Sequence, residues 1–313
     1  MINNVIVTGA TGMIGATLIK KMLSKDINIT AIVRPNSPKL INLPVNPKLK
    51  IIECDISNLK KLIGNLPKNY DTFFHMAWLG TYGAQRDNVE LQEKNVKYTL
   101  DAVELAHSCG CKVFVGAGSQ AEFGYVNNII TDYTPINPVT GYGICKYVAG
   151  KLSALQCKKY GIRQSWGRII SAYGPMDNDY TMVMSSIIKM INGEHCPFTK
   201  GEQIWDYIFS DDCAEAFYLI GKYGKDGKAY TIASGQNKPL RDFIKIMRDV
   251  VNPELEIGFG ELEYYPNQVM NLTADISELV NDTGFIPKTD FQQGIKKCVD
   301  WLNEANKLQK KNQ

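Results

Sequence analysis

The chain has 313 residues, a length that can bury a substantial core in one or two lobes. Hydrophobic residues make up 44% of it and charged residues 21%, a balance that excludes a disordered chain and a coiled coil. The formal net charge of +3 is too small to indicate binding to nucleic acid or to a membrane surface.

No apolar run approaches the roughly 20 residues that a membrane-spanning helix needs. The N-terminal residues lead directly into an apolar strand pattern and lack the three regions of a signal peptide. The eight cysteines are scattered, without a CxxC pair or zinc-ligand spacing, which is typical of reduced thiols in the cytoplasm. Asp211 and Asp212 could suggest a metal, but we interpret them as caps of the following helix. We therefore predict a cytoplasmic protein without a metal centre.

The first two thirds of the chain alternate between apolar strands and helices. Strands are expected at residues 2–8, 27–33, 49–53, 71–75, 112–116 and 163–170, and helices at 13–24, 84–107 and 142–160. Near-continuous apolar strands joined through helices indicate a parallel sheet that is covered on both faces. We therefore predict a Rossmann-type, doubly wound α/β domain over residues 1–174, with contributions from later segments.

The pattern changes after about residue 175. Short strands and Pro/Gly turns are mixed with helices expected at about 180–192, 211–222, 239–250, 275–282 and 290–308. This irregular mixture predicts a smaller, mixed α/β lobe over residues 175–313 that binds the substrate. Because no clear linker separates the lobes, we expect them to share a cleft.

A glycine-rich turn over residues 8–15, TGATGMIG, joins the first expected strand to the first helix. Gly9 permits a tight turn, Gly12 lets the backbone approach a pyrophosphate, and Gly15 lets the helix pack closely on the strand. The N-terminus of the helix then offers N–H groups to phosphate. The strand–turn–helix context predicts a dinucleotide site.

The end of the second strand bears on the choice of cofactor. An acidic residue there would bind the ribose 2′-hydroxyl of NAD, but the sequence reads Val33-Arg34-Pro35-Asn36-Ser37. Arg34 can bind a 2′-phosphate, with help from Ser37 or Lys39, unless it is simply a solvated loop residue. We therefore favour NADP(H), with NAD(H) as the alternative.

Asp55 ends the third strand and has two interpretations that the chemistry does not separate. Its carboxylate could accept the adenine amino group, or it could cap the helix that begins near Asn58.

Three residues form a candidate catalytic set. Tyr142 and Lys146 are spaced i and i+4, which places them on one face of a helix. A cation beside the phenol lowers its pKa and makes Tyr142 a credible proton donor or acceptor. Ser119 follows the fifth strand at the carboxyl edge of the sheet and can hydrogen-bond a carbonyl or alkoxide.

The motifs now form a recognisable series. In order they are the 8–15 turn, His75-Met76-Ala77, Asn95, Ser119, Tyr142 with Lys146, Arg168 with Tyr173-Gly174-Pro175, and the run WDYIFSDD at 205–212. Over residues 2 to 303 the chain resembles the extended short-chain dehydrogenase/reductases. More narrowly, it resembles their NAD-dependent epimerase/dehydratase family, which acts on nucleotide sugars. Its C-terminal part is similar to the CDP-abequose synthase branch, whose members reduce a 4-keto sugar.

The resemblance implies a role for each matching residue. The pyrophosphate would be held by Gly9, Thr11, Gly12, Met13 and Ile14, and adenine would contact Asp55 and Ile56. Ala77 and Asn95 would lie near the nicotinamide and the reactive groups, and Tyr142 and Lys146 would move the proton and hold the ribose. The substrate would contact Ser119, Gln120, Ser171, Trp205 and Tyr265. The helices at 84–107 and 142–160 commonly form a four-helix bundle in the family's dimers. A homodimer and a sugar substrate are therefore expected.

Two departures from the family pattern concern the reaction and the substrate. Dehydratases carry acidic residues where this chain has Gln120 and Ala121, and Glu122 falls one position late, which makes elimination chemistry doubtful. The arginine of the family's "RDY" is Trp205 here, and a second arginine is replaced within Tyr264-Tyr265-Pro266. Bidentate phosphate contacts would be lost, and aromatic stacking could replace them.

Three functions remain open from the sequence. The favoured one is reduction of the 4-keto group of a nucleotide-linked sugar with NADP(H). The second is a 4-epimerase that holds NAD tightly, since it would use the same catalytic residues. The third is a non-catalytic sensor of dinucleotides, against which the joint presence of Ser119, Tyr142 and Lys146 argues.

Overall fold

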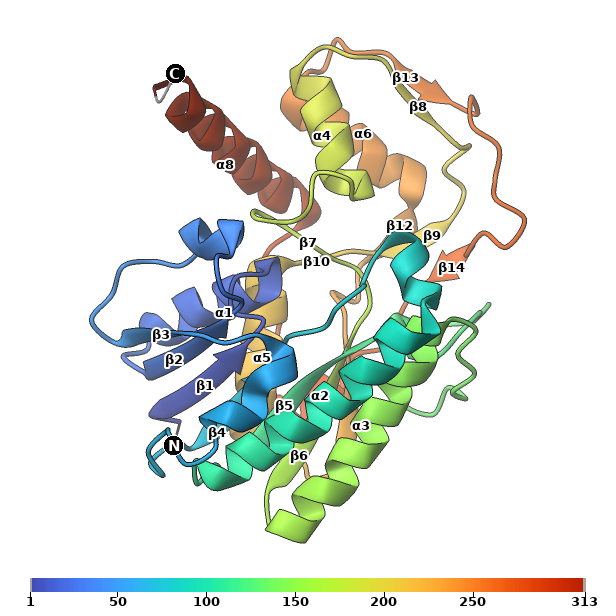
Figure 1. The fold of residues 1–313 in the computed structure, drawn as a ribbon. Coiled ribbons are helices and arrows are strands. Elements are labelled where there is room, and N and C mark those ends of the chain that lie inside the picture. The colour runs from blue at the N-terminus through green and yellow to red at the C-terminus, as the bar shows by residue number, and fades with distance from the viewer. Residues whose placement is uncertain (1, 312–313) are drawn as a thin grey trace.

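The computed structural model describes residues 2–311, with side-chain surroundings as far as residue 304. Its centre is a seven-stranded parallel sheet in the order β11-β6-β5-β4-β1-β2-β3 (Figure 1). The strands are β1 (Asn4–Thr8), β2 (Asn28–Val33), β3 (Leu49–Glu53), β4 (Thr72–His75), β5 (Val113–Ser119), β6 (Arg163–Ile169) and β11 (Lys228–Ile232). The strand order reverses between β1 and β4, where such folds bind ligands. The predicted Rossmann-type fold is confirmed.

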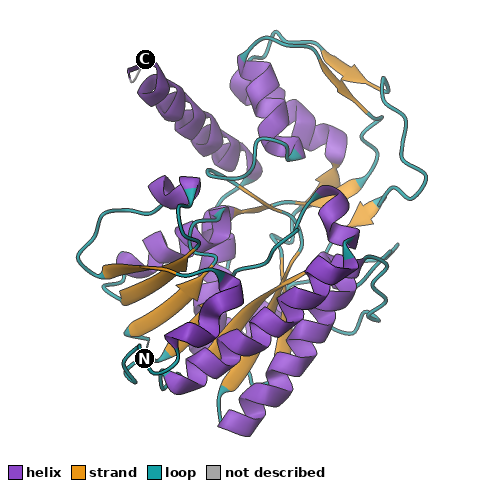
Figure 2. Cartoon of the chain, viewed as in Figure 1, coloured by secondary structure: helices purple, strands orange, loops and turns teal. Residues whose placement is uncertain are grey.

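Helices cover both faces of this sheet (Figure 2). On one face lie α1 (Met13–Leu23) and α5 (Ser210–Tyr223), and on the other lie α2 (Val89–Ser108) and α3 (Gly141–Tyr160). Side chains alternate along β1, so Val5 and Val7 pack into the first core and Ile6 into the second. The central strands are buried on both sides and read as apolar runs, whereas β3 at the edge of the sheet is mostly exposed.

The helix expected from residue 84 begins later, at Val89. Its N-cap is Asn88, whose side-chain oxygen accepts the N–H of Leu91 at 3.0 Å. The five residues before it, Gly83–Asp87, form a separate 3₁₀ turn. This turn lies at the carboxyl side of the sheet and contributes to the site described below.

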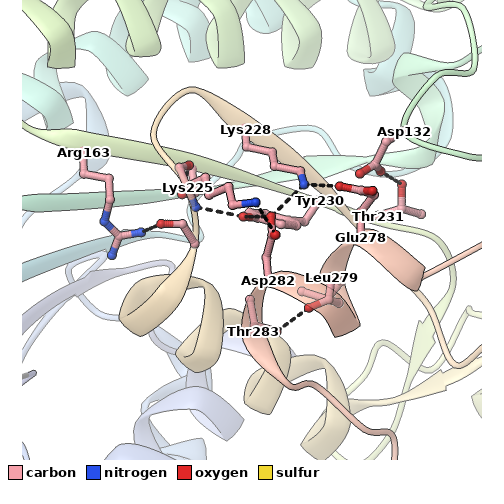
Figure 3. Close-up of polar contacts among 12 residues, drawn as sticks. Asp132, Arg163, Lys225, Lys228, Tyr230, Thr231, Glu278, Leu279, Asp282 and Thr283 are labelled. Carbon is pink, nitrogen blue, oxygen red and sulfur yellow. Dashed lines mark hydrogen bonds and ion pairs between the residues drawn. The ribbon is translucent and has the colours of Figure 1, made fainter.

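The seventh strand, β11, comes from the second half of the chain and was not predicted. It pairs with β6 in parallel and is covered by α7 (Ser277–Thr283). Lys228 on β11 bonds the carboxylates of Glu278 and Asp282 on α7, and Tyr230 donates to Asp282 at 2.9 Å (Figure 3). The sheet therefore draws its last strand from beyond residue 174.

The smaller lobe stands beyond the carboxyl ends of the strands (Figure 1). Its core contains Tyr173, Phe209, Phe243 and Phe291, whose rings pack against one another. It contains α4 (Met182–Ile191), α6 (Leu240–Val251), α8 (Phe291–Lys311), the sheet β12 (Asn237–Pro239), β9 (Ile204–Asp206) and β14 (Asn271–Leu272), the pair β13 (Ile257–Phe259) and β8 (Cys196–Phe198), and the pair β10 (Ile208–Phe209) and β7 (Ala172–Tyr173). This mixed α/β composition matches the prediction.

Asp211 and Asp212 do not cap α5, contrary to the interpretation from sequence. The helix begins at Ser210, so both residues lie in its first turn. Asp212 accepts the backbone N–H groups of Lys288 and Thr289 at 3.1 and 2.9 Å, which ties α5 to the segment before α8. Across residues 2–311, the structure contains no cluster of three metal-ligating side chains and no helix suited by length and apolarity to span a bilayer.

Candidate active site

The glycine turn has the geometry that its sequence predicts. Gly9 adopts φ +65°, and a Cβ there would lie 2.6 Å from the backbone nitrogen of Ala77. A Cβ on Gly15 would collide with the carbonyl oxygen of Gly9. Gly12 is the N-cap of α1, and a Cβ there would meet only Gly9, at 3.5 Å. The backbone is therefore bare where α1 begins, which suits close approach of a phosphate.

A cavity of about 480 Å³ opens beside this turn, at the carboxyl ends of β1 and β4. All of the predicted cofactor residues except Asn95 line it. They are Gly9, Thr11, Gly12, Met13, Ile14, Arg34, Asp55, Ile56, Ala77, Tyr142 and Lys146. The glycine turn, the end of β2 and the first turns of α3 thus meet around one space, and its lining fits a dinucleotide.

The end of β2 supplies the basic side of this cavity. Arg34, Ser37 and Lys39 all line it, and the Lys39 amine donates to the side-chain oxygen of Asn178 at 2.7 Å. Asp55 caps the turn after β3, since its carboxylate accepts the N–H and O–H of Ser57 at 2.9 and 2.6 Å. These bonds, and then the charge of Arg34, lower the pKa of Asp55. The capping role is thereby established, while a contact of Asp55 with adenine stays a prediction.

Tyr142 and Lys146 lie at the opposite end of the cavity, on the first turns of α3. The helix starts there because Thr140 caps it, accepting the N–H of Gly143 at 3.1 Å. The Lys146 amine donates to the carbonyl of Ala117 at 2.6 Å. Burial lowers the pKa of Lys146 to about 7, against the opposing charge of Glu122.

Tyr142 is 8% exposed, and burial has the largest effect on the pKa of its phenol. Burial raises the pKa of the phenol, whereas the nearby Ser119 side chain and the charge of Arg86 lower it. Ser119 ends β5, as expected, and its hydroxyl also accepts the N–H of Ala121 at 3.2 Å. The phenol is therefore protonated at neutral pH and lies beside a hydroxyl that can share a substrate oxygen.

Glu122 points away from the cavity. Residues 120–122 form a 3₁₀ turn after Ser119, and the Glu122 side chain is fully buried. It accepts the N–H of Ser119 at 3.0 Å, the indole N–H of Trp166 at 2.9 Å and the guanidinium of Arg168 at 2.7 Å. The Glu122 carboxylate is thus hydrogen-bonded within the protein, and Glu122 is not among the residues that line the cavity.

Asn95 lies behind the cavity wall and does not line it. It is 1% exposed, and its side-chain amide bonds the N–H and C=O of Leu79, both at 2.9 Å. Leu79 does line the cavity. Asn95 thus supports the cavity wall through Leu79, and its contact with the cofactor stays a prediction.

Two residues beside the catalytic pair were not found from sequence. The Trp78 ring lies 4.0 Å from the Lys146 amine and packs edge-on against Tyr142. The Arg86 guanidinium lies over the Tyr142 ring, 4.7 Å from its centroid. Both come from the segment between β4 and α2. No local sequence pattern predicts the conformation of this segment.

None of the predicted substrate residues, Ser119, Gln120, Ser171, Trp205 and Tyr265, is among the residues that line the cavity. The Trp205 indole donates to the Ser171 hydroxyl at 3.1 Å, so these two groups satisfy each other. Tyr265 is 79% exposed. The structure brings Ser171 and Trp205 together but does not join them to the catalytic pair, and their contacts with substrate stay predictions.

A family model described as "NAD dependent epimerase/dehydratase family" matches residues 5–233. The chain belongs to this family. The match runs from the glycine turn through Tyr142 and Lys146 to the end of β11, so it covers the sheet that holds the cavity. The resemblance to extended short-chain dehydrogenase/reductase enzymes that act on nucleotide sugars is confirmed.

Individual relatives are distant but match along almost their whole length. A putative UDP-glucose 4-epimerase from Methanocaldococcus jannaschii is 24% identical, over 97% of this chain and 99% of the relative. CDP-abequose synthase from Salmonella typhimurium is also 24% identical, over 95% and 98%. A mutant UDP-glucuronic acid 4-epimerase from Bacillus cereus, solved with UDP-4-deoxy-4-fluoro-glucuronic acid and NAD, superposes with a TM-score of 0.83 at 20% identity, over 96% and 99%.

Proposed function

We propose that this enzyme of the family reduces the 4-keto group of a nucleotide-linked sugar with NADPH as the hydride donor. Tyr142 would give its phenolic proton to the carbonyl oxygen and Ser119 would hydrogen-bond the same oxygen, and bound NADPH would supply the hydride for the carbon. Lys146 would hold the ribose of the cofactor beside Tyr142. Solvent then returns a proton to Tyr142, which balances the reaction.

The observation that carries this proposal is the lining of the cavity at the end of β2, where Arg34, Ser37 and Lys39 favour NADPH. The reaction then needs Tyr142 as its acid. Burial raises the pKa of the phenol, so it is protonated at neutral pH. A ketone reduction needs an acid at this position, whereas oxidation of an alcohol needs a base. A protonated phenol can therefore act as the acid of a reduction.

Elimination is disfavoured by the position of Glu122. A 4,6-dehydratase needs an acidic group at the substrate, but this carboxylate is 0% exposed and bonded to Trp166 and Arg168. Gln120 and Ala121, which occupy the family's acidic positions, cannot move a proton. The remaining groups, Ser119 and Tyr142, suffice for reduction.

The preference for NADPH rests on the basic end of the cavity. Arg34, Ser37 and Lys39 line the place where an NAD-selective site carries an acidic group. A 2′-phosphate there would receive charge-assisted hydrogen bonds from Arg34. NAD is the alternative, because the Bacillus cereus relative was solved with NAD.

A 4-epimerase is the second candidate, since two of the relatives named above carry that activity in their names. Epimerisation returns the same hydride to the sugar, so the cofactor would stay bound through turnover. Reduction consumes NADPH, so the cofactor must exchange. Retention of the cofactor through turnover therefore distinguishes a 4-epimerase from a reductase.

The first experiment identifies the cofactor bound to freshly purified protein. Released dinucleotide is identified after denaturation, and the emptied protein is titrated with NADPH and NADH. We expect an empty or exchangeable site that prefers NADPH. Stoichiometric NAD carried through purification would contradict the reductase and favour the epimerase.

Turnover of 4-keto sugar nucleotides is then compared between the wild type and Tyr142→Phe. Loss of the proton donor should lower kcat by about 10²–10⁴-fold while NADPH binding persists. Arg34→Met should weaken binding of NADPH but not of NADH, and serves as the control for the cofactor assignment. Wild-type turnover by Tyr142→Phe would show the mechanism to be wrong.

A further inference from the structure

The amine of Lys146 lies between a backbone carbonyl and an aromatic ring. Lys146 is 3% exposed, and its amine donates to the carbonyl of Ala117 at 2.6 Å. The same amine lies over the ring of Trp78, 4.0 Å from the ring centre. The buried carboxylate of Glu122, in the turn after β5, is already paired with Arg168. The side chain of Trp78 is therefore a principal neighbour of this buried charge.

The orientation of the Trp78 ring is fixed by a hydrogen bond to α2. Its indole N–H donates to the side-chain oxygen of Gln92 at 2.8 Å. Gln92 is fully buried, and its amide donates to the carbonyls of Gly80 and Gln85, both at 2.8 Å. The ring also packs edge-on against Tyr142, with the two planes at 86°. The ring cannot turn away from the Lys146 amine without breaking its bond to Gln92.

An aromatic face stabilises a cation without using up its hydrogen-bond donors. The face of a tryptophan ring attracts an ammonium group, and the attraction is stronger where water is excluded. An ammonium carries three N–H donors, and Ala117 takes one of those of Lys146. Lys146 and Trp78 both line the cavity. The remaining donors of Lys146 can therefore serve a ligand in the cavity.

Other side chains at the position of Trp78 would treat the Lys146 amine differently. A carboxylate would form an ion pair with the amine and occupy a second donor. An aliphatic side chain would leave the buried charge without a compensating partner on that side. The tryptophan ring avoids both effects, because it stabilises the charge and accepts no conventional hydrogen bond at its face.

The geometry points to Trp78 as a positioning residue, whose ring face holds the charged Lys146 amine at the cavity wall with donors free for the hydroxyls of the cofactor ribose. Trp78 thereby also keeps the ammonium beside Tyr142. The inference rests on the proposed role of Lys146 in holding the ribose. It predicts that Trp78 and Lys146 act on cofactor binding as one unit.

The test is a double-mutant cycle of Trp78→Leu and Lys146→Met, in which calorimetry measures the dissociation constant of NADPH. We expect Trp78→Leu to weaken binding about tenfold when Lys146 is present, because the ammonium loses its aromatic face. In the Lys146→Met background the same change should weaken binding less than about twofold. Trp78→Phe keeps an aromatic face and should weaken binding only about threefold. Equal losses from Trp78→Leu in both backgrounds would overturn the inference.

A second cycle uses the free protein and needs no cofactor. The four proteins are unfolded in urea, and Trp78→Leu should lower the free energy of unfolding more in the wild type than in Lys146→Met. Additive effects on this free energy would overturn the inference, whatever the affinity for NADPH. Non-additive effects in a protein that binds neither NADPH nor NADH would uphold the ring as the partner of the amine and contradict the proposed function.

The control is Trp301→Leu, which removes a half-buried tryptophan from α8 in the smaller lobe. Its effects on NADPH binding and on the free energy of unfolding should add to those of Lys146→Met. Coupling of Trp301 to Lys146 as strong as that of Trp78 would overturn the inference, because the cycles would then report a general loss of stability.

Discussion

Glu122 carries a buried charge whose partners lie on β5 and β6. A carboxylate removed from water is tolerated only when it is paired and its oxygens are hydrogen-bonded. Here the pairing comes from Arg168, and further bonds come from the indole of Trp166 and the N–H of Ser119. The group therefore fixes the end of β5, from which the Ser119 hydroxyl projects.

We expect Glu122→Gln to destabilise the protein by about 3–5 kcal/mol, because it leaves the buried Arg168 without its counter-charge. The measurement is the free energy of unfolding in urea. Glu261→Gln is the control, since Glu261 pairs with His195 at the surface, and it should change stability by less than about 0.5 kcal/mol. A Glu122→Gln protein with wild-type stability but no turnover would contradict the structural role and indicate a chemical one.

Strand β11 forms an edge of the sheet and depends on α7 for cover. The contact between the two elements is electrostatic, because the Asp282 carboxylate binds the amines of Lys225 and Lys228 at 2.6 and 2.7 Å and accepts from Tyr230 (Figure 3). Burial opposes its ionisation, but these bonds prevail and lower the pKa of Asp282 to about 2. One side chain thus joins the last strand of the sheet to its covering helix.

This pKa gives the Asp282 contribution a definite pH dependence. The folded pKa of about 2 lies below the usual value for an aspartate in an unfolded chain, about 4. The stabilisation is therefore fully present above the unfolded value and is lost as pH falls through the folded one. We expect Asp282→Asn to cost about 2 kcal/mol at pH 7.

The difference between wild type and Asp282→Asn should shrink as pH falls from about 5 toward 2. Urea unfolding at several pH values measures it. Asp249→Asn removes an exposed carboxylate paired with Arg248 and should cost less than about 1 kcal/mol throughout. A cost for Asp282→Asn that stays constant down to pH 2 would show that its charge is not the cause.

At the scale of the whole molecule, the first two thirds of the fold could be predicted because contiguous residues specify each element. The apolar run of β1 and the glycines of the turn are examples, since their state depends on neighbours in sequence. Strand β11 was missed because KAYTI is short and half polar. Its strand conformation comes from pairing with β6, more than 60 residues earlier, and no local pattern records that contact.

The candidate site likewise contains residues that could be predicted from the sequence and residues that could not. Tyr142, Lys146 and the glycines were predicted because their spacing within one element encodes their relation. Arg86 and Trp78 were not, because the carbonyls that Gln92 binds decide where their segment lies. Glu122 was recognised as displaced from the family's acidic position, but its turn toward Arg168 depends on a strand distant in sequence.

The outer face of α3 bears on the assembly of the molecule. Ile144, Leu152 and Leu155 are 46%, 39% and 67% exposed, and their spacing places them along one stripe of the helix. Helices α2 and α3 lie side by side on the same face of the sheet (Figure 1). Pairing this face with a second copy would bury the stripe in a four-helix bundle, as the family resemblance implies.

We therefore expect a homodimer that Leu155→Lys dissociates, because a dimer formed through this face would have to bury two added charges. Sedimentation velocity over a range of protein concentrations measures the oligomeric state. Leu262→Lys is the matched control, since Leu262 is 50% exposed and its N–H bonds the carbonyl of Phe198 on β8, in the smaller lobe. Dissociation by both variants, or by neither, would place the dimer contact elsewhere. A monomeric Leu155→Lys that keeps the wild-type free energy of unfolding would show that each protomer completes its own core.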